Sequence, residues 1–187
     1  MRRLLTTSLA AMAVALVPAL TSCSPDNDDD DKDKNIDKAW VSANEAYITQ
    51  AAALTESDGS PFYESVTAPW NSGATVLMHW FNDRALTEGN LRPMLTSTVS
   101  VKYHGELING VRFDDSYSNT DSLFTTGLTS VVEGWTVALT QMHVGDSVRV
   151  VIPEGAGYGS TQQGSIPSYS TLVFNIKLVE IPHYETR

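Results

Sequence analysis

The stretch that decides the fold runs Val131-Val132-Glu133-Gly134-Trp135-Thr136-Val137-Ala138-Leu139. Its apolar side chains recur at helical spacing, which predicts one short helix whose apolar side includes Val132, Trp135 and Leu139. Strands are expected on both sides of it, because apolar and polar residues alternate there with a period of two. The alternating apolar residues are Val99, Val101 and Tyr103 before the helix, and Val148, Val150, Ile152, Leu172, Phe174, Ile176 and Leu178 after it. Several antiparallel strands around one short helix predict an α+β domain.

Turn-forming residues connect these strands. Asn109-Gly110 suits the positive φ angles of a tight turn. A further short strand is expected around Leu123-Phe124-Thr125. Residues 153–170 are rich in glycine and serine, so they predict a long loop before the last strand.

Five blocks of this half of the chain are similar to the signature of FKBP-type peptidyl-prolyl cis-trans isomerases, in the family's order and with near-family spacing over residues 96–181. The blocks are residues 101–107 with 109–110 and 113–114, residues 131–135, residues 141–146, residues 152–154 with 157–159, and residues 166–167 with 171–174. The resemblance implies an FKBP-like fold, a twisted antiparallel sheet wrapped around the one short helix. It also implies an apolar pocket between helix and sheet, and peptidyl-prolyl cis-trans isomerase activity.

The same resemblance assigns the residues of that pocket. The residues implied in catalysis are Tyr103, Phe113, Asp114, Val132, Trp135, Tyr158 and Phe174, and those implied in substrate binding are Phe124, Val131 and Ile166. Trp135 would form the floor of the pocket. Rotation about an X-Pro bond makes and breaks no covalent bond, so no cofactor and no metal are expected.

These residues also have purely structural interpretations. Without the resemblance, the inward-facing rings of Tyr103, Trp135 and Phe174 would be assigned to the core, and Asp114 would be assigned to a turn cap. With it, Asp114 is expected near the rotating carbonyl. There it would act either through its electric field or by orienting Tyr103.

Two serines depart from the family pattern. Ser122 and Ser165 stand where the family often has an aromatic and an aliphatic residue, which predicts a more polar rim. They favour a second hypothesis, an FKBP-fold chaperone or binding lipoprotein with little or no turnover. A third hypothesis is a structural envelope lipoprotein that docks a larger assembly, and residues 37–95, outside the resemblance, favour it.

The N-terminus has the order of residues found in secretory signal peptides. Arg2 and Arg3 precede an apolar run over residues 4–20. This run is too short and too interrupted to predict a transmembrane helix. Leu20-Thr21-Ser22-Cys23 resembles the lipobox of bacterial lipoproteins. We therefore expect a signal peptide over residues 1–22 and lipid attachment at Cys23. The chain would then be exported and anchored to a bacterial envelope membrane. The outer membrane is the one expected, with the domain on either its periplasmic or its surface face.

Residues 23–36 are expected to form an acidic tether, because a run of like charges with no apolar residue cannot collapse. Residues 37–95 are expected to form an extension that packs on the isomerase domain of residues 96–187. Apolar residues at helical spacing predict a helix over residues 37–54. Extended segments are predicted over residues 62–70 and 75–81, joined by a turn at Asn71-Ser72-Gly73. Residues 75–81 are too apolar to lie in solvent, so they should pair at the sheet edge or cover a sheet face, and His79 among them should be packed and hydrogen-bonded.

Composition excludes several classes of protein. The formal net charge is −10 and the sequence shows no basic stripe, so a nucleic-acid partner is not expected. The single cysteine excludes an intramolecular disulfide and a cysteine metal cluster. No spacing typical of a Ser-His-Asp triad or of metal ligands is present in the sequence. The expected partners are proline-containing polypeptide clients and the membrane, and the chain is expected to be a monomer.

Overall fold

The computed structural model describes residues 37–185. The expected signal peptide, Cys23 and the acidic tether lie outside the described residues. The elements in chain order are α1 (Lys38–Ala52), β1 (Glu64–Ala68), β2 (Asn71–Trp80), the 3-10 turn η1 (Arg84–Leu86), β3 (Thr98–Leu107), β4 (Arg112–Asp115), β5 (Phe124–Gly127), η2 (Leu128–Ser130), α2 (Glu133–Leu139), β6 (Ser147–Ile152), η3 (Glu154–Ala156) and β7 (Leu172–His183). No helix within this part of the chain is both long and apolar enough to cross a membrane.

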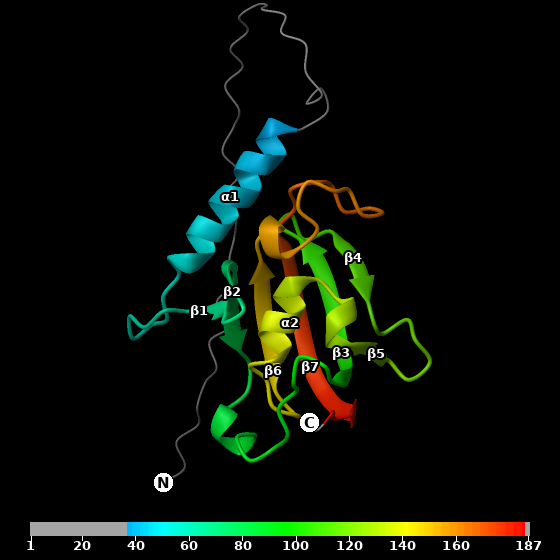
Figure 1. The fold of residues 1–187 in the computed structure, drawn as a ribbon. Helices are drawn as coiled ribbons and strands as arrows, with labels where there is room; N and C mark the ends of the chain where they lie inside the picture. The colour runs from blue at the N-terminus through cyan, green and yellow to red at the C-terminus, as the bar shows by residue number, and fades with distance from the viewer. Residues whose placement is uncertain (1–36, 186–187) are drawn as a thin grey trace, which may run out of the picture. The chain divides into compact units, whose positions relative to one another are not determined.

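A seven-stranded antiparallel sheet organises the fold (Figure 1). The strands follow one another in the order β1-β2-β6-β7-β3-β4, and β5 also pairs with β3. The long pair β3 and β7 lies in the middle, in a register that sets Tyr103 opposite Ile176 and Gly105 opposite Phe174. The predicted α+β class is confirmed, and the single helix expected within the C-terminal half is α2.

The main core lies between α2 and one face of the sheet. Alternate residues of the strands face it, including Val76 of β2, Val150 of β6 and Ile176 of β7. Gly134 allows α2 to lie directly on the sheet, because a Cβ at this position would overlap the side chain of Ile152. Because of this close contact, Trp135, the next residue of α2, lies in the main core.

The other face of the sheet carries a smaller core under the C-terminal end of α1. Its buried members are Ala51, Tyr63, Leu77, Val151 and Val173, and Tyr47, Ile48, Leu54 and Phe62 pack against them. The helix begins after Asp37, whose carboxylate accepts hydrogen bonds from two backbone N–H groups of the first turn. The predicted helix over residues 37–54 is therefore confirmed, with its ends shortened to Lys38–Ala52.

Strand β2 lies inside the sheet, between β1 and β6. Residues 75–81 were expected to pair at the sheet edge or to cover a sheet face. Most of them do pair with the sheet, with Leu77 opposite Val151, but one strand in from the edge, because β1 forms the edge instead. The expected turn at residues 71–73 is wrong, because these residues already belong to β2. The chain reverses at Pro69-Trp70 instead, and a bulge brings Ala68 opposite Asn71. Proline presets the backbone φ angle that such a reversal needs.

His79 is packed and hydrogen-bonded, as the sequence predicted. Its Nδ1 lies 2.8 Å from the carbonyl oxygen of Phe62. Its ring is stacked on the Phe62 ring with centroids 3.8 Å apart. These contacts fix the start of β1 against β2.

A buried carboxylate joins the segment after β2 to the turn before β6. The side chain of Asp146 accepts hydrogen bonds from Thr87 Oγ1 at 2.5 Å and Asn82 Nδ2 at 3.0 Å. The backbone N–H of His143 donates to it at 2.8 Å, and Arg84 lies 3.8 Å away. Burial alone would raise the pKa of Asp146, but these hydrogen bonds and the arginine hold it below its ordinary value. The carboxylate therefore remains ionised in the folded protein.

Candidate active site

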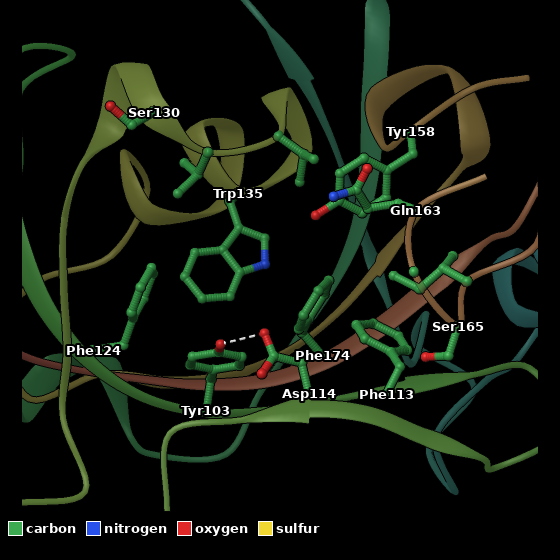
Figure 2. A pocket seen from close by; sticks show the side chains of 14 residues that line it. Tyr103, Phe113, Asp114, Phe124, Ser130, Trp135, Tyr158, Gln163, Ser165 and Phe174 are labelled. Atoms are coloured by element: carbon green, nitrogen blue, oxygen red, sulfur yellow. Dashed lines mark hydrogen bonds between the residues drawn. The ribbon is translucent and has the colours of Figure 1, made fainter. Parts of the chain in front are cut away.

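A pocket of about 620 Å³ opens between α2 and the concave side of the sheet (Figure 2). Its lining residues are Tyr103, Phe113, Asp114, Phe124, Ser130, Val131, Val132, Trp135, Tyr158, Gln163, Gly164, Ser165, Ile166 and Phe174. All ten residues assigned from the family resemblance are among them. The structure thus brings together residues from β3, β4, β5, β7, α2 and the loop before β7.

Trp135 forms the floor, and only 4% of its surface is exposed. The rings of Tyr103 and Phe174 meet it edge-on, with centroids 4.9 and 5.2 Å away and interplanar angles of 86° and 85°. Phe124 lies further out, 6.2 Å from the same ring. The indole nitrogen of Trp135 has no hydrogen-bond partner among residues 37–185. The floor is therefore a rigid aromatic surface to which water has little access.

Phe113 and Phe174 form the wall next to this floor. Their centroids are 5.4 Å apart and their planes nearly perpendicular. Both rings lie directly over the backbone of Gly105, where an added Cβ would fall 2.5 Å from Phe174 and 2.7 Å from Phe113. A glycine at this position of β3 is therefore required for the two rings to lie close to the sheet.

Asp114 is the acidic residue of the pocket lining. Its Oδ2 accepts a hydrogen bond from the Tyr103 hydroxyl at 2.6 Å, drawn as a dashed line in Figure 2. Its Oδ1 accepts one from the Asp115 backbone N–H at 2.9 Å. Burial, followed by the hydrogen bond to Asp114, raises the pKa of Tyr103 well above its ordinary value. The tyrosine therefore stays protonated, and the carboxylate is held in one orientation beside the aromatic wall.

Tyr158 stands at the rim, across Figure 2 from Phe124. It is partly open to solvent, with 38% of its surface exposed. Burial of the rest of the ring, with the charge of Asp114 as a smaller cause, raises the pKa of Tyr158. Its hydroxyl group is consequently protonated at neutral pH and can donate a hydrogen bond at the edge of the pocket.

Sequence reasoning did not assign three residues of the lining, Ser130, Gln163 and Gly164. Gln163 and Ile166 form an isolated β-bridge that folds the intervening residues into a tight turn. The Gln-Gly-Ser sequence before Ile166 has the composition of a turn, and it is the signal that could have indicated these residues. Ser165 lies in the lining as expected, whereas Ser122 is not part of it. Ser122 instead has a φ of 58° and accepts a hydrogen bond from Ser116 through its carbonyl oxygen, so it does not contribute to the rim.

Helix α1 holds the end of the loop that carries Tyr158 and Ile166. The indole N–H of Trp40 donates to Ser170 Oγ at 3.2 Å, and that hydroxyl donates to the carbonyl oxygen of Pro167 at 2.7 Å. One turn later, Asn44 Oδ1 accepts from the backbone N–H of Thr171 at 2.7 Å. Asn44 and Thr171 are both buried, so these bonds are shielded from competition by water.

The chemistry open to this site is non-covalent. The lining contains aromatic rings, aliphatic side chains, one carboxylate and several hydroxyl groups, without a histidine or cysteine that could activate a nucleophile. Among residues 37–185, His, Asp and Glu side chains do not gather in groups of three or more that could hold a metal ion. The pocket is suited to enclosing an apolar ring and to hydrogen-bonding the amide groups beside it.

Comparison with known proteins agrees with this geometry. Residues 89–179 match the family model described as FKBP-type peptidyl-prolyl cis-trans isomerase. The FK506-binding protein 2 of Debaryomyces hansenii is 40% identical over 84 residues, which are 44% of this chain and 62% of that protein. The FKBP-type peptidyl-prolyl cis-trans isomerase FkpA of Escherichia coli K12 is 38% identical over 89 residues, 48% of this chain and 33% of that protein. The matched region thus spans less than two thirds of each of these relatives.

A solved structure extends the similarity beyond the matched region. A peptidyl-prolyl cis-trans isomerase of Pseudomonas syringae pv. tomato superposes with a TM-score of 0.64 and 26% sequence identity, over 80% of this chain and 98% of that one. FkpA of Escherichia coli superposes with a TM-score of 0.60 over 75% of this chain and 60% of that one.

Proposed function

Because residues 89–179 belong to the FKBP-type peptidyl-prolyl cis-trans isomerase family, we propose that the chain catalyses rotation about X-Pro bonds in exported polypeptides. The observation that carries the proposal is the aromatic pocket with a single oriented carboxylate, Asp114, in its wall. The groups of the chain itself are sufficient for this chemistry, because rotation about an X-Pro bond makes and breaks no covalent bond.

The barrier to this rotation is about 18–20 kcal/mol and arises from amide resonance. Resonance is lost as the bond twists, so the twisted amide is less polar than the planar one. A pocket of apolar rings removes water from the amide and favours the twisted form over the planar form. Phe113, Trp135 and Phe174 would hold the proline ring while the carbonyl before it turns.

Three polar groups would hold the rest of the peptide. The Tyr158 hydroxyl and the backbone N–H of Val132, which precedes α2, would donate to substrate carbonyl oxygens. Asp114 would lie beside the rotating carbonyl. The 2.6 Å hydrogen bond from Tyr103 supports a role in which the carboxylate is held at a constant position, so that its field acts without reorganisation.

We place this activity outside the cytoplasm. The sequence Leu20-Thr21-Ser22-Cys23 resembles a lipobox, and acylation of the Cys23 thiol would anchor the chain to a bacterial envelope membrane, with the acidic tether between lipid and domain. Metabolic labelling with a radioactive fatty acid tests this. The Cys23→Ser variant should take up no label, and labelling equal to that of the unchanged chain contradicts the anchor.

A second candidate function is favoured by the polar side of the rim. Ser165 and Gln163 line the pocket where apolar contacts would hold a ligand more tightly. A chaperone or binding lipoprotein of the same fold would grip exposed proline-containing segments with little turnover.

A protease-coupled isomerisation assay separates the two functions. The full chain is tested on short peptides that differ in the residue before proline. Acceleration of at least one peptide supports the isomerase. A folded chain that accelerates none of them, yet binds an unfolded polypeptide, rejects the isomerase and supports the binding protein.

A further inference from the structure

A second hollow adjoins the aromatic pocket. It has a volume of about 290 Å³ and is lined by Trp70, Leu95, Leu128, Thr129, Val131, Glu133 and Thr136. Val131 is in the lining of both hollows. The second hollow, hereafter the side hollow, therefore adjoins the pocket proposed to hold proline at the Val131 side chain.

The side hollow is mostly apolar, and the side chains of Glu133 and Thr136 in its lining already have hydrogen-bond partners. Trp70 and Leu95 are 42% and 44% exposed, while Leu128, also in the lining, is buried. The Glu133 carboxylate accepts hydrogen bonds from Trp70 Nε1 at 3.0 Å and from Asn71 Nδ2 at 3.0 and 3.1 Å. The hydroxyl of Thr136 donates to the Leu128 carbonyl oxygen at 2.8 Å. An occupant would consequently gain by burying apolar surface, and an acidic occupant would be repelled by Glu133.

Both exposed walls are fixed before any ligand arrives. Trp70 lies in the turn between β1 and β2, and its hydrogen bond to Glu133 holds the indole against the start of α2. Leu95 lies in a turn closed by the hydrogen bond from the Met94 N–H to Ser97 Oγ at 2.9 Å. A rigid aromatic side chain that is already oriented loses little conformational entropy on binding, which favours affinity.

We propose that the side hollow is a subsite for an apolar side chain of the same polypeptide whose proline enters the aromatic pocket, two residues away from that proline. The proposal rests on the proposed isomerase function. An extended chain advances about 3.3–3.6 Å per residue, and side chains two residues apart point to the same side. A side chain two residues away from the bound proline can therefore lie beyond the Val131 side chain and enter the side hollow.

The size of the side hollow favours this occupant over a second protein molecule. Stable protein–protein interfaces bury about 1,200–2,000 Å² in total, from some 20–30 residues on each side. Seven residues line the side hollow, and its volume falls just below the range of about 300–1,000 Å³ typical of small-molecule pockets. It therefore fits one side chain, held in place by a proline bound next to it.

The test compares peptides that differ at one position. The full chain is assayed on X-Pro peptides carrying Leu, Gly or Asp two residues before proline, and on a second set with the change two residues after it. We expect kcat/KM for Leu to exceed that for Gly by about tenfold in one of the two sets, with Asp lower than Gly. Ratios near one in both sets overturn the subsite.

Variants of the lining residues show which side chains cause the preference for Leu over Gly. Leu95→Ala and Trp70→Ala should each lower the Leu-to-Gly ratio at least threefold, and Trp70→Phe, which keeps an aromatic ring, should restore part of it. Leu91→Ala is the matched control, because Leu91 belongs to the same segment, is 58% exposed and lies outside both linings. An equal loss in Leu91→Ala, or an unchanged ratio in Leu95→Ala, contradicts the assignment.

A binding measurement keeps this result distinct from a failure of the proposed function. In nuclear magnetic resonance spectra of the full chain, the Leu peptide should shift the Trp70 indole N–H signal, and the Gly peptide should leave it in place. Isomerisation of the Gly peptide by the unchanged chain reports on the enzyme alone. A chain that isomerises no peptide but shows the Trp70 shift rejects the enzyme and retains the subsite. Isomerisation without a Trp70 shift and without a preference for Leu retains the enzyme and rejects the subsite.

Discussion

Residues 37–95 and residues 96–185 contribute differently to the site. All fourteen residues that line the aromatic pocket come from the second region. The first region supports it at three places, through α1 at Ser170 and Thr171, through β2 beside β6, and through Thr87 and Asn82 at Asp146. The comparison shows that the groups proposed for chemistry and the groups that hold them can lie in separate stretches of one chain.

The largest expected effect comes from cutting the link at Asp146. Asp146→Ala removes the acceptor of the Asn82 side-chain amide, one of the two acceptors of the Thr87 hydroxyl, and the carboxylate near Arg84. We expect a loss of about 3–5 kcal/mol in the free energy of unfolding, measured with urea. Asp83→Ala is the control, since this exposed residue only caps η1 and should cost about 1 kcal/mol. Equal losses for both variants would show that the two regions are not joined here.

The same link predicts how stability depends on pH. The folded-state pKa of Asp146 is lowered, and an unfolded aspartate titrates near about 3.9. Its stabilising contribution is therefore complete above about pH 3.9 and is lost as the pH falls through the lower folded-state value. Unfolding measured between pH 7 and pH 2.5 should show the unchanged chain losing more stability than Asp146→Asn. Parallel curves for the two proteins would contradict a lowered pKa.

A smaller effect is expected within the second region, at the pocket. Asp114→Asn preserves the volume of the side chain but removes its charge. We expect kcat/KM for an X-Pro peptide to fall about tenfold, which corresponds to about 1.4 kcal/mol. Asp121→Asn, an exposed aspartate outside the pocket, should leave the rate unchanged. Full activity in a folded Asp114→Asn protein would argue against an electrostatic role of this residue.

The smallest effect is expected where α1 holds the loop. Trp40→Phe removes the hydrogen bond to Ser170 and keeps an aromatic ring, so the free energy of unfolding should fall by about 0.5–1.5 kcal/mol. Amide hydrogen exchange in residues 153–170 should become faster. Trp80→Phe makes the same chemical change at a hydrogen bond to Glu64 and should leave exchange in this loop unaltered. Faster exchange in both variants would mean that α1 has no special role in holding it.

The sequence predicted the second region better than the first, and the reason is physical. Leu172, Phe174, Ile176 and Leu178 alternate along β7 because one side of this strand is buried in the main core, while Val173 on the other side belongs to the smaller core. The place of β2 within the sheet depends on its pairing with β6, a contact between distant parts of the chain that no local pattern encodes. The turn at Pro69-Trp70 was missed because Asn71-Ser72-Gly73 also has the composition of a turn.

Loop residues of the site were missed for another reason. Ser130 and Gln163 lie in segments without periodicity, so their direction is set by tertiary contacts. Nine of the ten assigned lining residues came from motif positions, whose spacing carries over the geometry of a whole family, and Phe124 lies outside the five blocks. Gly105 belonged to such a motif, yet its need for close contact with Phe113 and Phe174 became clear only from their positions.

The pairing of Leu77 with Val151 also constrains the order in which the chain folds. In a chain that is made N-terminus first, β1 and β2 are present before β6. A two-stranded hairpin is only marginally stable in water, so Val76 and Met78, both fully buried in the finished protein, remain uncovered during that interval. A sheet completed by such long-range pairing forms slowly. The first region therefore keeps apolar surface exposed until β6 is available to pair with β2.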